Sequence, residues 1–248
     1  MFPIRDHNPS DKTPFVTYAL IATNIVVFLG YWPLFTDDRR LAQFFFEWAM
    51  IPENISVGRN LYSLLTSMFL HAGFWHLAGN MLFLWIFGDN LEEDLGHVGF
   101  LIFYLASGVG AGLVHVLAAP WSAVPTVGAS GAIAGVMGAY LLLYPKARVD
   151  VLLIFIVFFK IFPVPAWVML GIWFGLQLLN GFGTPTEGGG VAYWAHIGGF
   201  VIGFLWVIPL WLKRGGRGYW QRTDGHPNHP PAEYVLNKSR VPTIRRIK

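Results

Sequence analysis

Six apolar stretches constrain the fold of this chain more than any other feature of its sequence. None of them contains Asp, Glu, Lys or Arg, and they cover residues 15–32, 69–88, 100–119, 129–144, 165–180 and 191–212. About 20 apolar residues, rising about 1.5 Å each in a helix, cross the hydrocarbon core of a bilayer. Charged residues make up only 12% of the chain, against about 25% in soluble domains. The sequence therefore predicts an all-α membrane protein, a bundle of six transmembrane helices with a short central fourth helix.

The chain divides into a polar N-terminal segment (1–14), a membrane domain (15–212) and a basic tail (213–248). The N-terminal segment lacks the basic-then-apolar order of a signal peptide, so we expect the first span to be retained. Residues 149–162 are apolar but short, and Lys160 interrupts them. We expect this segment to be interfacial or partly re-entrant, and not a seventh span. Because there is no cysteine, disulfides and thiol nucleophiles are excluded.

The distribution of Lys and Arg predicts the orientation of the bundle. With six spans, 14 of the 17 basic residues fall on the side of the two termini. Basic residues concentrate in cytoplasmic segments, so we expect both termini in the cytoplasm of a bacterial-type plasma membrane. The second, fourth and sixth spans then all begin at the outer face. This orientation brings His76, Ser130 and His196 to one depth on the outer side.

Ser130 stands at the start of the fourth span, in Gly128-Ala129-Ser130-Gly131. Sixteen residues give only about 24 Å of helix, so we expect the helix to begin below the membrane surface, beside a water-filled cavity. The free N–H groups of a helix start favour an oxyanion. The alternative is a serine that only packs, bonded to a carbonyl one turn back.

Small residues predict that the fourth and sixth spans approach closely. A histidine in an apolar span is a functional candidate by default, although His196 could also be a structural residue. Facing glycines let two helix backbones come together, so that a Ser–His hydrogen bond becomes possible. These glycines are Gly128, Gly131 and Gly135 beside Ser130, and Gly199 and Gly203 after His196.

The second span carries His76 and Asn80, which share one helical face. Both side chains can donate hydrogen bonds to an oxyanion, and the alternative is a structural network between helices. His71 and His115 are interpreted as structural. No span contains an acidic residue, so a Ser–His–Asp triad or an aspartate pair within the membrane is excluded. The His-Glu-x-x-His of a zinc protease is also absent, which leaves a Ser–His dyad.

Three separated motifs make this sequence resemble the rhomboid family of intramembrane serine proteases. They are His76-x-x-x-Asn80, Gly128-Ala129-Ser130-Gly131 and Ala195-His196-x-Gly198-Gly199, and Glu92-x-x-x-Gly96 also fits. The resemblance covers residues 57–211. It implies a six-helix rhomboid-like bundle with neither metal nor cofactor, in which Ser130 is the nucleophile and His196 the general base. It also implies an oxyanion hole formed by His76, Asn80 and the backbone N–H of Ser130, and a lateral gate at the fifth span.

Two positions depart from patterns found in some members of that family. An aromatic residue one turn after the serine, stacked on the base, is replaced here by Ala134, so another contact must orient His196. The Trp-Arg pair of the first loop is replaced by Tyr62-Ser63, so the conformation of that loop is not predicted.

The resemblance implies that the partners are transmembrane protein substrates and membrane lipids, with no nucleic acid; the sequence does not indicate an oligomeric state. One alternative is a non-catalytic rhomboid-like protein that binds membrane clients, which predicts loss of the serine or the histidine. Another is a transporter lined by histidines, which would need acidic partners in the spans. The sequence retains Ser130 and His196 and has no acid in the spans, so both alternatives are disfavoured.

Overall fold

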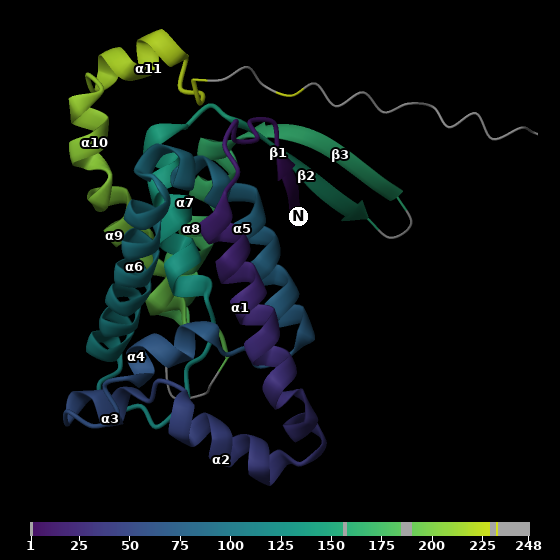
Figure 1. Ribbon diagram of the computed structural model, residues 1–248, viewed down its shortest axis with the longest axis vertical. Helices are drawn as coiled ribbons and strands as arrows, with labels where there is room; N and C mark the ends of the chain where they lie inside the picture. The colour runs from purple at the N-terminus through teal and green to yellow at the C-terminus, as the bar shows by residue number, and fades with distance from the viewer. Residues whose placement is uncertain (1, 156–157, 185–189, 229–231, 233–248) are drawn as a thin grey trace, which may run out of the picture.

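The computed structural model describes residues 2–155, 158–184, 190–228 and 232, which form a helical bundle with a small sheet at one end (Figure 1). By length and composition, four helical segments among these residues could cross a membrane, and α7 is a shorter apolar helix. The prediction of a helical membrane bundle is therefore confirmed. The elements in chain order are β1 (Phe2–Asp6), α1 (Phe15–Tyr31), η1 (Trp32–Thr36), α2 (Asp38–Trp48), α3 (Pro52–Ser56), α4 (Ser63–Thr66), η2 (Ser67–Phe69), α5 (Phe74–Leu95), α6 (His97–Ala118), α7 (Ser130–Leu143), β2 (Arg148–Phe155), β3 (Phe158–Pro165), α8 (Ala166–Gly183), α9 (Tyr193–Trp206), α10 (Ile208–Lys213) and α11 (Arg217–Thr223).

Helix α7 is the short central helix that the sequence predicts. It has 14 residues, and every residue from 131 to 140 is buried. It packs against α5, α6, α8 and α9, so its apolar surface is covered by protein and not by lipid. A short helix with no lipid-facing side can begin inside the bundle, because its first N–H groups are surrounded by protein and cavity.

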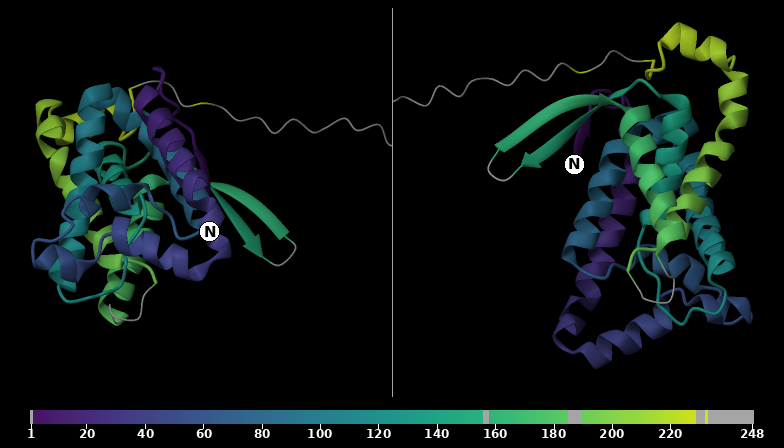
Figure 2. Two further views of the ribbon diagram at one scale, coloured as in Figure 1. Left: turned by 60° about the horizontal axis from the view of Figure 1, so that its bottom comes forward. Right: turned by 180° about the vertical axis from the view of Figure 1, so that it is seen from behind.

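The two ends of the bundle differ in structure. The small sheet and α11 lie at one end, while α2, α3 and α4 lie at the other (Figures 1 and 2). Helix α2 begins where Asp37 accepts hydrogen bonds from the N–H groups of Arg39 and Arg40, both 3.1 Å, as an N-cap. Nothing in the sequence analysis predicted these three short helices. They shape the long connection between α1 and α5.

A buried carboxylate joins the start of α1 to the end of α5. Glu92 accepts hydrogen bonds from the backbone N–H groups of Val16 and Thr17 at 2.8 and 2.7 Å, and from the Thr17 hydroxyl at 2.7 Å. Nδ1 of His97 lies 2.6 Å from the same carboxylate. The first N–H groups of a helix have no partner within the helix, so Glu92 caps α1 from a neighbouring helix.

Several boundaries differ from the predicted spans. Helix α5, which corresponds to the predicted second span, begins at Phe74 and not at residue 69. It continues to Leu95, beyond the predicted end at residue 88. It extends because hydrogen bonds satisfy the acidic residues of its last turns, as they do for Glu92 and Asp94. The sixth span is split into α9 and α10 at Val207, since Pro209 cannot donate a backbone hydrogen bond to the turn before it.

The segment 149–162, which we expected to be interfacial or partly re-entrant, lies in a sheet over its described residues. Strands β2 and β3 pair antiparallel, and β1 pairs antiparallel with β2 in the order β1-β2-β3, a pairing that the sequence analysis did not predict. The hairpin projects from the end of the bundle that holds the sheet (Figure 2). Arg5 and His7, from β1 and the residue after it, both lie 2.7 Å from the carboxylate of Asp150 on β2. Pairing with the N-terminal strand stabilises an extended conformation that the local sequence does not reveal.

The first part of the basic tail packs against the bundle. Arg214 forms a two-pronged ion pair with Asp94 at 2.7 and 2.8 Å, and hydrogen bonds to Asp94 raise the pKa of this guanidinium. The indole N–H of Trp220 donates to the carbonyl of Leu142 at 2.9 Å. Five basic residues of the tail lie outside the described residues: Lys238, Arg240, Arg245, Arg246 and Lys248.

Candidate active site

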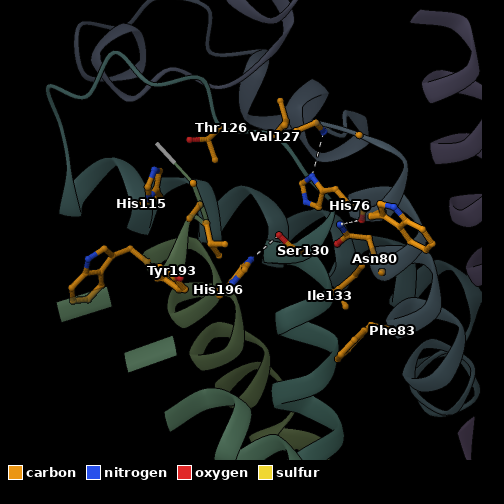
Figure 3. Close-up of a pocket in the computed structure, with 18 of the residues that line it drawn as sticks. His76, Asn80, Phe83, His115, Thr126, Val127, Ser130, Ile133, Tyr193 and His196 are labelled. Atoms are coloured by element: carbon orange, nitrogen blue, oxygen red, sulfur yellow. Dashed lines mark hydrogen bonds between the residues drawn. The ribbon is translucent and has the colours of Figure 1, made fainter. Parts of the chain in front are cut away.

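A cavity of about 850 Å³ lies where α5, α7 and α9 begin. Its wall contains polar side chains from four helices: His76 and Asn80 of α5, His115 of α6, Ser130 of α7 and His196 of α9 (Figure 3). Apolar residues such as Phe83 and Trp173 line the rest. An apolar cavity with a few converging polar groups is the usual form of a ligand or active site.

Ser130 and His196 meet in this wall. Ser130 is the first residue of α7, and His196 lies in the first turn of α9. The Ser130 Oγ is 2.8 Å from Nε2 of His196, with Oγ directed at the imidazole (Figure 3). The two residues are 66 positions apart in the chain. A hydroxyl in hydrogen-bond contact with a base is the arrangement that activates a nucleophile.

Contacts between glycines set the spacing of α7 and α9. A Cβ at Gly199 would overlap the carbonyl of Gly131, and a Cβ at Gly203 would overlap the carbonyl of Gly135. Any side chain at these positions would push the helices apart and separate Ser130 from His196. The glycines thus determine the distance between the two reactive atoms.

His76 and Asn80 occupy the opposite wall. Nδ1 of His76 accepts a hydrogen bond from the N–H of Ala72 at 3.3 Å, so the ring proton of neutral His76 is on Nε2. The amide of Asn80 donates to the carbonyl of His76 at 2.8 Å and retains a second N–H. Both side chains therefore have a donor in the cavity region.

Gly128 lies in the loop before α7 and not at a helix contact. Its φ of +131° is a conformation that favours glycine, and a Cβ there would lie 2.9 Å from Nε2 of His76. Both the backbone conformation and the nearby imidazole therefore require glycine at position 128. Because Gly128 has no side chain, His76 can lie close to the start of α7.

Two backbone contacts hold the loop that leads to Ser130. Met50 and Thr126 exchange hydrogen bonds of 3.1 and 2.8 Å, and the N–H of Gly128 donates to the carbonyl of Ser67 at 2.9 Å. Both partners come from the connection between α1 and α5. Irregular backbone at membrane depth needs such partners, and here the first loop supplies them.

Comparisons with known proteins identify the family of this chain. A family model of the rhomboid domain matches residues 58–213. The chain belongs to the rhomboid family.

Rhomboid protein 1, mitochondrial, of Saccharomyces cerevisiae is 33% identical over 207 residues, which is 80% of this chain and 55% of that protein. Rhomboid protease GluP of Bacillus subtilis is 32% identical over 155 residues, 62% of this chain and 27% of that protein. RHOMBOID-like protein 6, mitochondrial, of Arabidopsis thaliana is 34% identical over 192 residues, 72% of this chain and 55% of that protein.

The aligned regions thus span about half the length, or less, of these rhomboid relatives. The matched family region includes the four side chains that the sequence analysis assigned to the catalytic site: His76, Asn80, Ser130 and His196. It does not include Met50, which anchors the loop before Ser130.

Two side chains of α8 contact His196 in this rhomboid. Ala134, where some members carry an aromatic residue, is fully buried and does not form a ring contact. The ring of Trp173 lies 5.7 Å from the imidazole of His196, between centroids. Oε1 of Gln177 lies 2.8 Å from Nδ1 of His196. The sequence analysis missed Gln177, although a polar amide in an apolar span signals an interhelical hydrogen bond.

The structure changes the interpretation of one other histidine. His115 is in the cavity wall, whereas the sequence analysis treated it as structural. His71, also interpreted as structural, is buried beside His76, with 5.1 Å between ring centroids, and does not line the cavity. Within the described ranges, no group of three or more His, Asp or Glu side chains is arranged to hold a metal ion.

Proposed function

We propose that this rhomboid is an intramembrane serine endopeptidase that cleaves transmembrane protein substrates with a Ser130–His196 dyad. The observation that carries the proposal is the 2.8 Å contact between Ser130 Oγ and His196 Nε2 in the wall of a cavity of about 850 Å³. The cavity lies inside a membrane bundle and has room for water and for an unwound peptide segment. The Bacillus subtilis relative is named a rhomboid protease, which supports the same chemistry.

The proposed reaction begins with proton transfer. Nε2 of His196 takes the Ser130 proton as Oγ attacks the substrate carbonyl, and the imidazolium then gives this proton to the leaving amine. The products are a released amine fragment and an ester between Ser130 and the new carboxyl end. Water then attacks this ester, again with His196 as base, and releases the second fragment.

The negative oxygen that forms in each attack needs hydrogen-bond donors. We infer that Nε2–H of His76, the free amide N–H of Asn80 and the backbone N–H of Ser130 supply them. The backbone N–H is free because Ser130 is the first residue of α7. The hydrogen bond from Ala72 supports this role for His76, because it directs the ring proton to Nε2.

The test is cleavage of a single-span substrate by the purified protein in detergent. Wild type should cleave it, while Ser130→Ala and His196→Ala should each abolish cleavage without unfolding the protein. The double variant should be no worse than either single variant, because members of one catalytic unit are not additive. Full activity in either single variant would reject the dyad. A wild type that binds the substrate without cutting it would favour the client-binding alternative.

We further propose that both termini are cytoplasmic, that the cavity faces the outer side of a bacterial-type plasma membrane, and that 15–212 is one membrane domain. The support is the distribution of basic residues, 14 of 17 on the side of the termini. Because the chain has no cysteine, single variants such as Arg59→Cys and Lys146→Cys can be labelled in intact cells. An impermeant maleimide should label the first and not the second, and the reverse pattern would invert the orientation.

A further inference from the structure

Gln177 is a buried polar side chain in the middle of α8. Its exposed fraction is 8%, and neighbouring residues of the helix are mostly apolar. Oε1 lies 2.8 Å from Nδ1 of His196. Within the described part of the chain, no carboxylate bonds this imidazole. The Gln177 amide thus occupies the position, relative to the histidine, that an acid occupies in a three-residue serine protease site.

The orientation of the amide follows from a second contact. Nε2 of Gln177 lies 3.4 Å from the carbonyl oxygen of Trp173, one turn earlier in α8. A carbonyl can only accept, so the NH₂ group must face it and Oε1 must face His196. Oε1 is itself an acceptor, so Nδ1 of His196 must carry a proton there. The lone pair of a neutral His196 is then on Nε2, directed at Ser130 Oγ.

We propose that Gln177 is a positioning residue of the proposed protease: it holds His196 in the tautomer and orientation that accept the Ser130 proton. This inference rests on the proposed function. The amide acts through His196 and does not touch the reacting atoms. Trp173, whose ring lies 5.7 Å from the imidazole, limits tilting of the ring on the same side.

The location of Gln177 has a consequence for how α8 can move. Ser130 and His196 are on α7 and α9, which glycine contacts hold together, but the orienting amide is on α8. Helix α8 packs on α9 mainly through aromatic rings. The rings of Phe174 and Phe200 are stacked, with 4.4 Å between their centroids. Any displacement of α8 away from α9 would withdraw Gln177 from His196. The site is therefore complete only when α8 is in the position seen here.

The test compares two substitutions of similar length in the full-length protein. Gln177→Met removes the acceptor but fills the same space. Gln177→Glu keeps an oxygen acceptor in either protonation state, and its neutral form can also donate to the Trp173 carbonyl. Asn180→Leu is the matched control, because its amide makes the same bond one turn back, to Leu176 at 2.8 Å, without reaching His196.

Three readouts separate positioning from packing: kcat and KM for a single-span substrate, the same constants for a small soluble ester, and the rate of labelling by a fluorophosphonate, which reacts with an activated serine. Gln177→Met should lower kcat and the labelling rate about tenfold, the effect of losing one orienting hydrogen bond, with KM unchanged. Gln177→Glu should recover most of the loss, and Asn180→Leu should behave as wild type. Gln177→Leu replaces Gln177→Met if the latter does not fold.

Wild-type kcat in Gln177→Met, a change confined to KM, or a Gln177→Glu variant as slow as Gln177→Met would each overturn the proposal. A wild type that neither cleaves nor reacts with the fluorophosphonate would instead reject the proposed function, and this inference with it. The two failures differ in whether Ser130-dependent labelling of the wild type is present.

Discussion

Gly203 of α9 lies so close to Gly135 of α7 that a Cβ on Gly203 would overlap the Gly135 carbonyl. We expect Gly203→Ala to push the two helices apart, to lower the melting temperature, and to reduce cleavage at least tenfold by lengthening the Ser130–His196 contact. Overpacking of this kind costs about 1–3 kcal/mol. Gly175→Ala is the control, because a Cβ there meets no atom within 4 Å. Equal activity of the two variants would show that the glycine contact does not set the site geometry.

Asn80→Ala should lower kcat by about 10²–10³, the typical effect of removing one oxyanion donor, while KM stays near the wild-type value. Asn24→Ala is a matched control. Asn24 also donates to the carbonyl four residues earlier, at 2.8 Å, but it is on α1 and does not line the cavity. Steady-state kinetics on one substrate distinguish the two. A rise in KM alone for Asn80→Ala would indicate substrate binding in place of oxyanion stabilisation.

Glu92→Ala should destabilise the fold by at least about 2 kcal/mol, because it leaves buried N–H groups at the start of α1 without an acceptor. Thermal unfolding in detergent measures the effect. Glu53→Ala, at an exposed position on α3, should change the melting temperature little. Because Glu92 is at the end of the bundle remote from the cavity, the activity that remains below the melting temperature should be normal. A selective loss of kcat would contradict this structural role.

Asp6, at the end of strand β1, should make the stability of the folded protein depend on pH. Burial, and next the nearby Asp89, raise the pKa of Asp6 to about 7, although hydrogen bonds from Tyr140 and Asn90 oppose the rise. A raised pKa means that the folded state favours the protonated carboxyl. The contribution of the protonated Asp6 carboxyl to the free energy of unfolding is complete below about pH 4, the pKa of an aspartate in the unfolded chain. It is lost as pH rises through about 7, and the free energy of unfolding falls by at most about 1.4 kcal/mol per pH unit.

Asp6→Asn removes this titration. The melting temperature of the variant relative to wild type should therefore increase between pH 5 and pH 8. Asp11→Asn, at an exposed position near the same end of the chain, is the control variant measured at the same two pH values. A difference for Asp6→Asn that does not depend on pH would mean that Asp6 ionises normally in the folded protein.

The two neighbouring aromatic residues of α8 should respond in opposite ways. Phe174 packs on Phe200, so Phe174→Ala should loosen α8 and speed cleavage of a transmembrane substrate about two- to tenfold, as expected for loss of one aromatic pair. Hydrolysis of a small ester should not speed up, because it needs no opening of α8 and a looser α8 holds Gln177 less firmly against His196. Trp173→Ala should instead slow both reactions, because its ring lies against His196. Identical effects of the two substitutions would reject this distinction.

The sequence predicted those parts of the fold that depend on local composition. The apolar spans, the short α7 and the depth shared by His76, Ser130 and His196 all follow from hydrophobic length and from topology. The hydrogen bond between Ser130 and His196 required only that facing glycines bring two helices together. These features could be predicted because each depends only on the composition of one span or on the order of the spans along the chain.

Features that depend on long-range contacts were missed. Strand β2 forms because residues 2–6 pair with it, a partner more than 140 positions away, and its apolar residues do not alternate clearly enough to suggest a strand. The role of Gln177 depends on which face of α8 is turned to α9. That rotation is set by ring packing between Phe174 and Phe200, not by any pattern within the helix.

The paired backbone of Met50 and Thr126 limits how short a working fragment of this protein can be. A fragment cut at residue 58, where the family match begins, would retain every side chain proposed to take part in cleavage. It would lose Met50, and with it the clamp on the loop before Ser130. It would also lose Tyr31, whose hydroxyl bonds both the N–H and the carbonyl of His71 at 2.7 Å. A minimal recombinant form of this protein must therefore begin upstream of α1, and its boundary is set by the supporting contacts and not by the residues proposed to react.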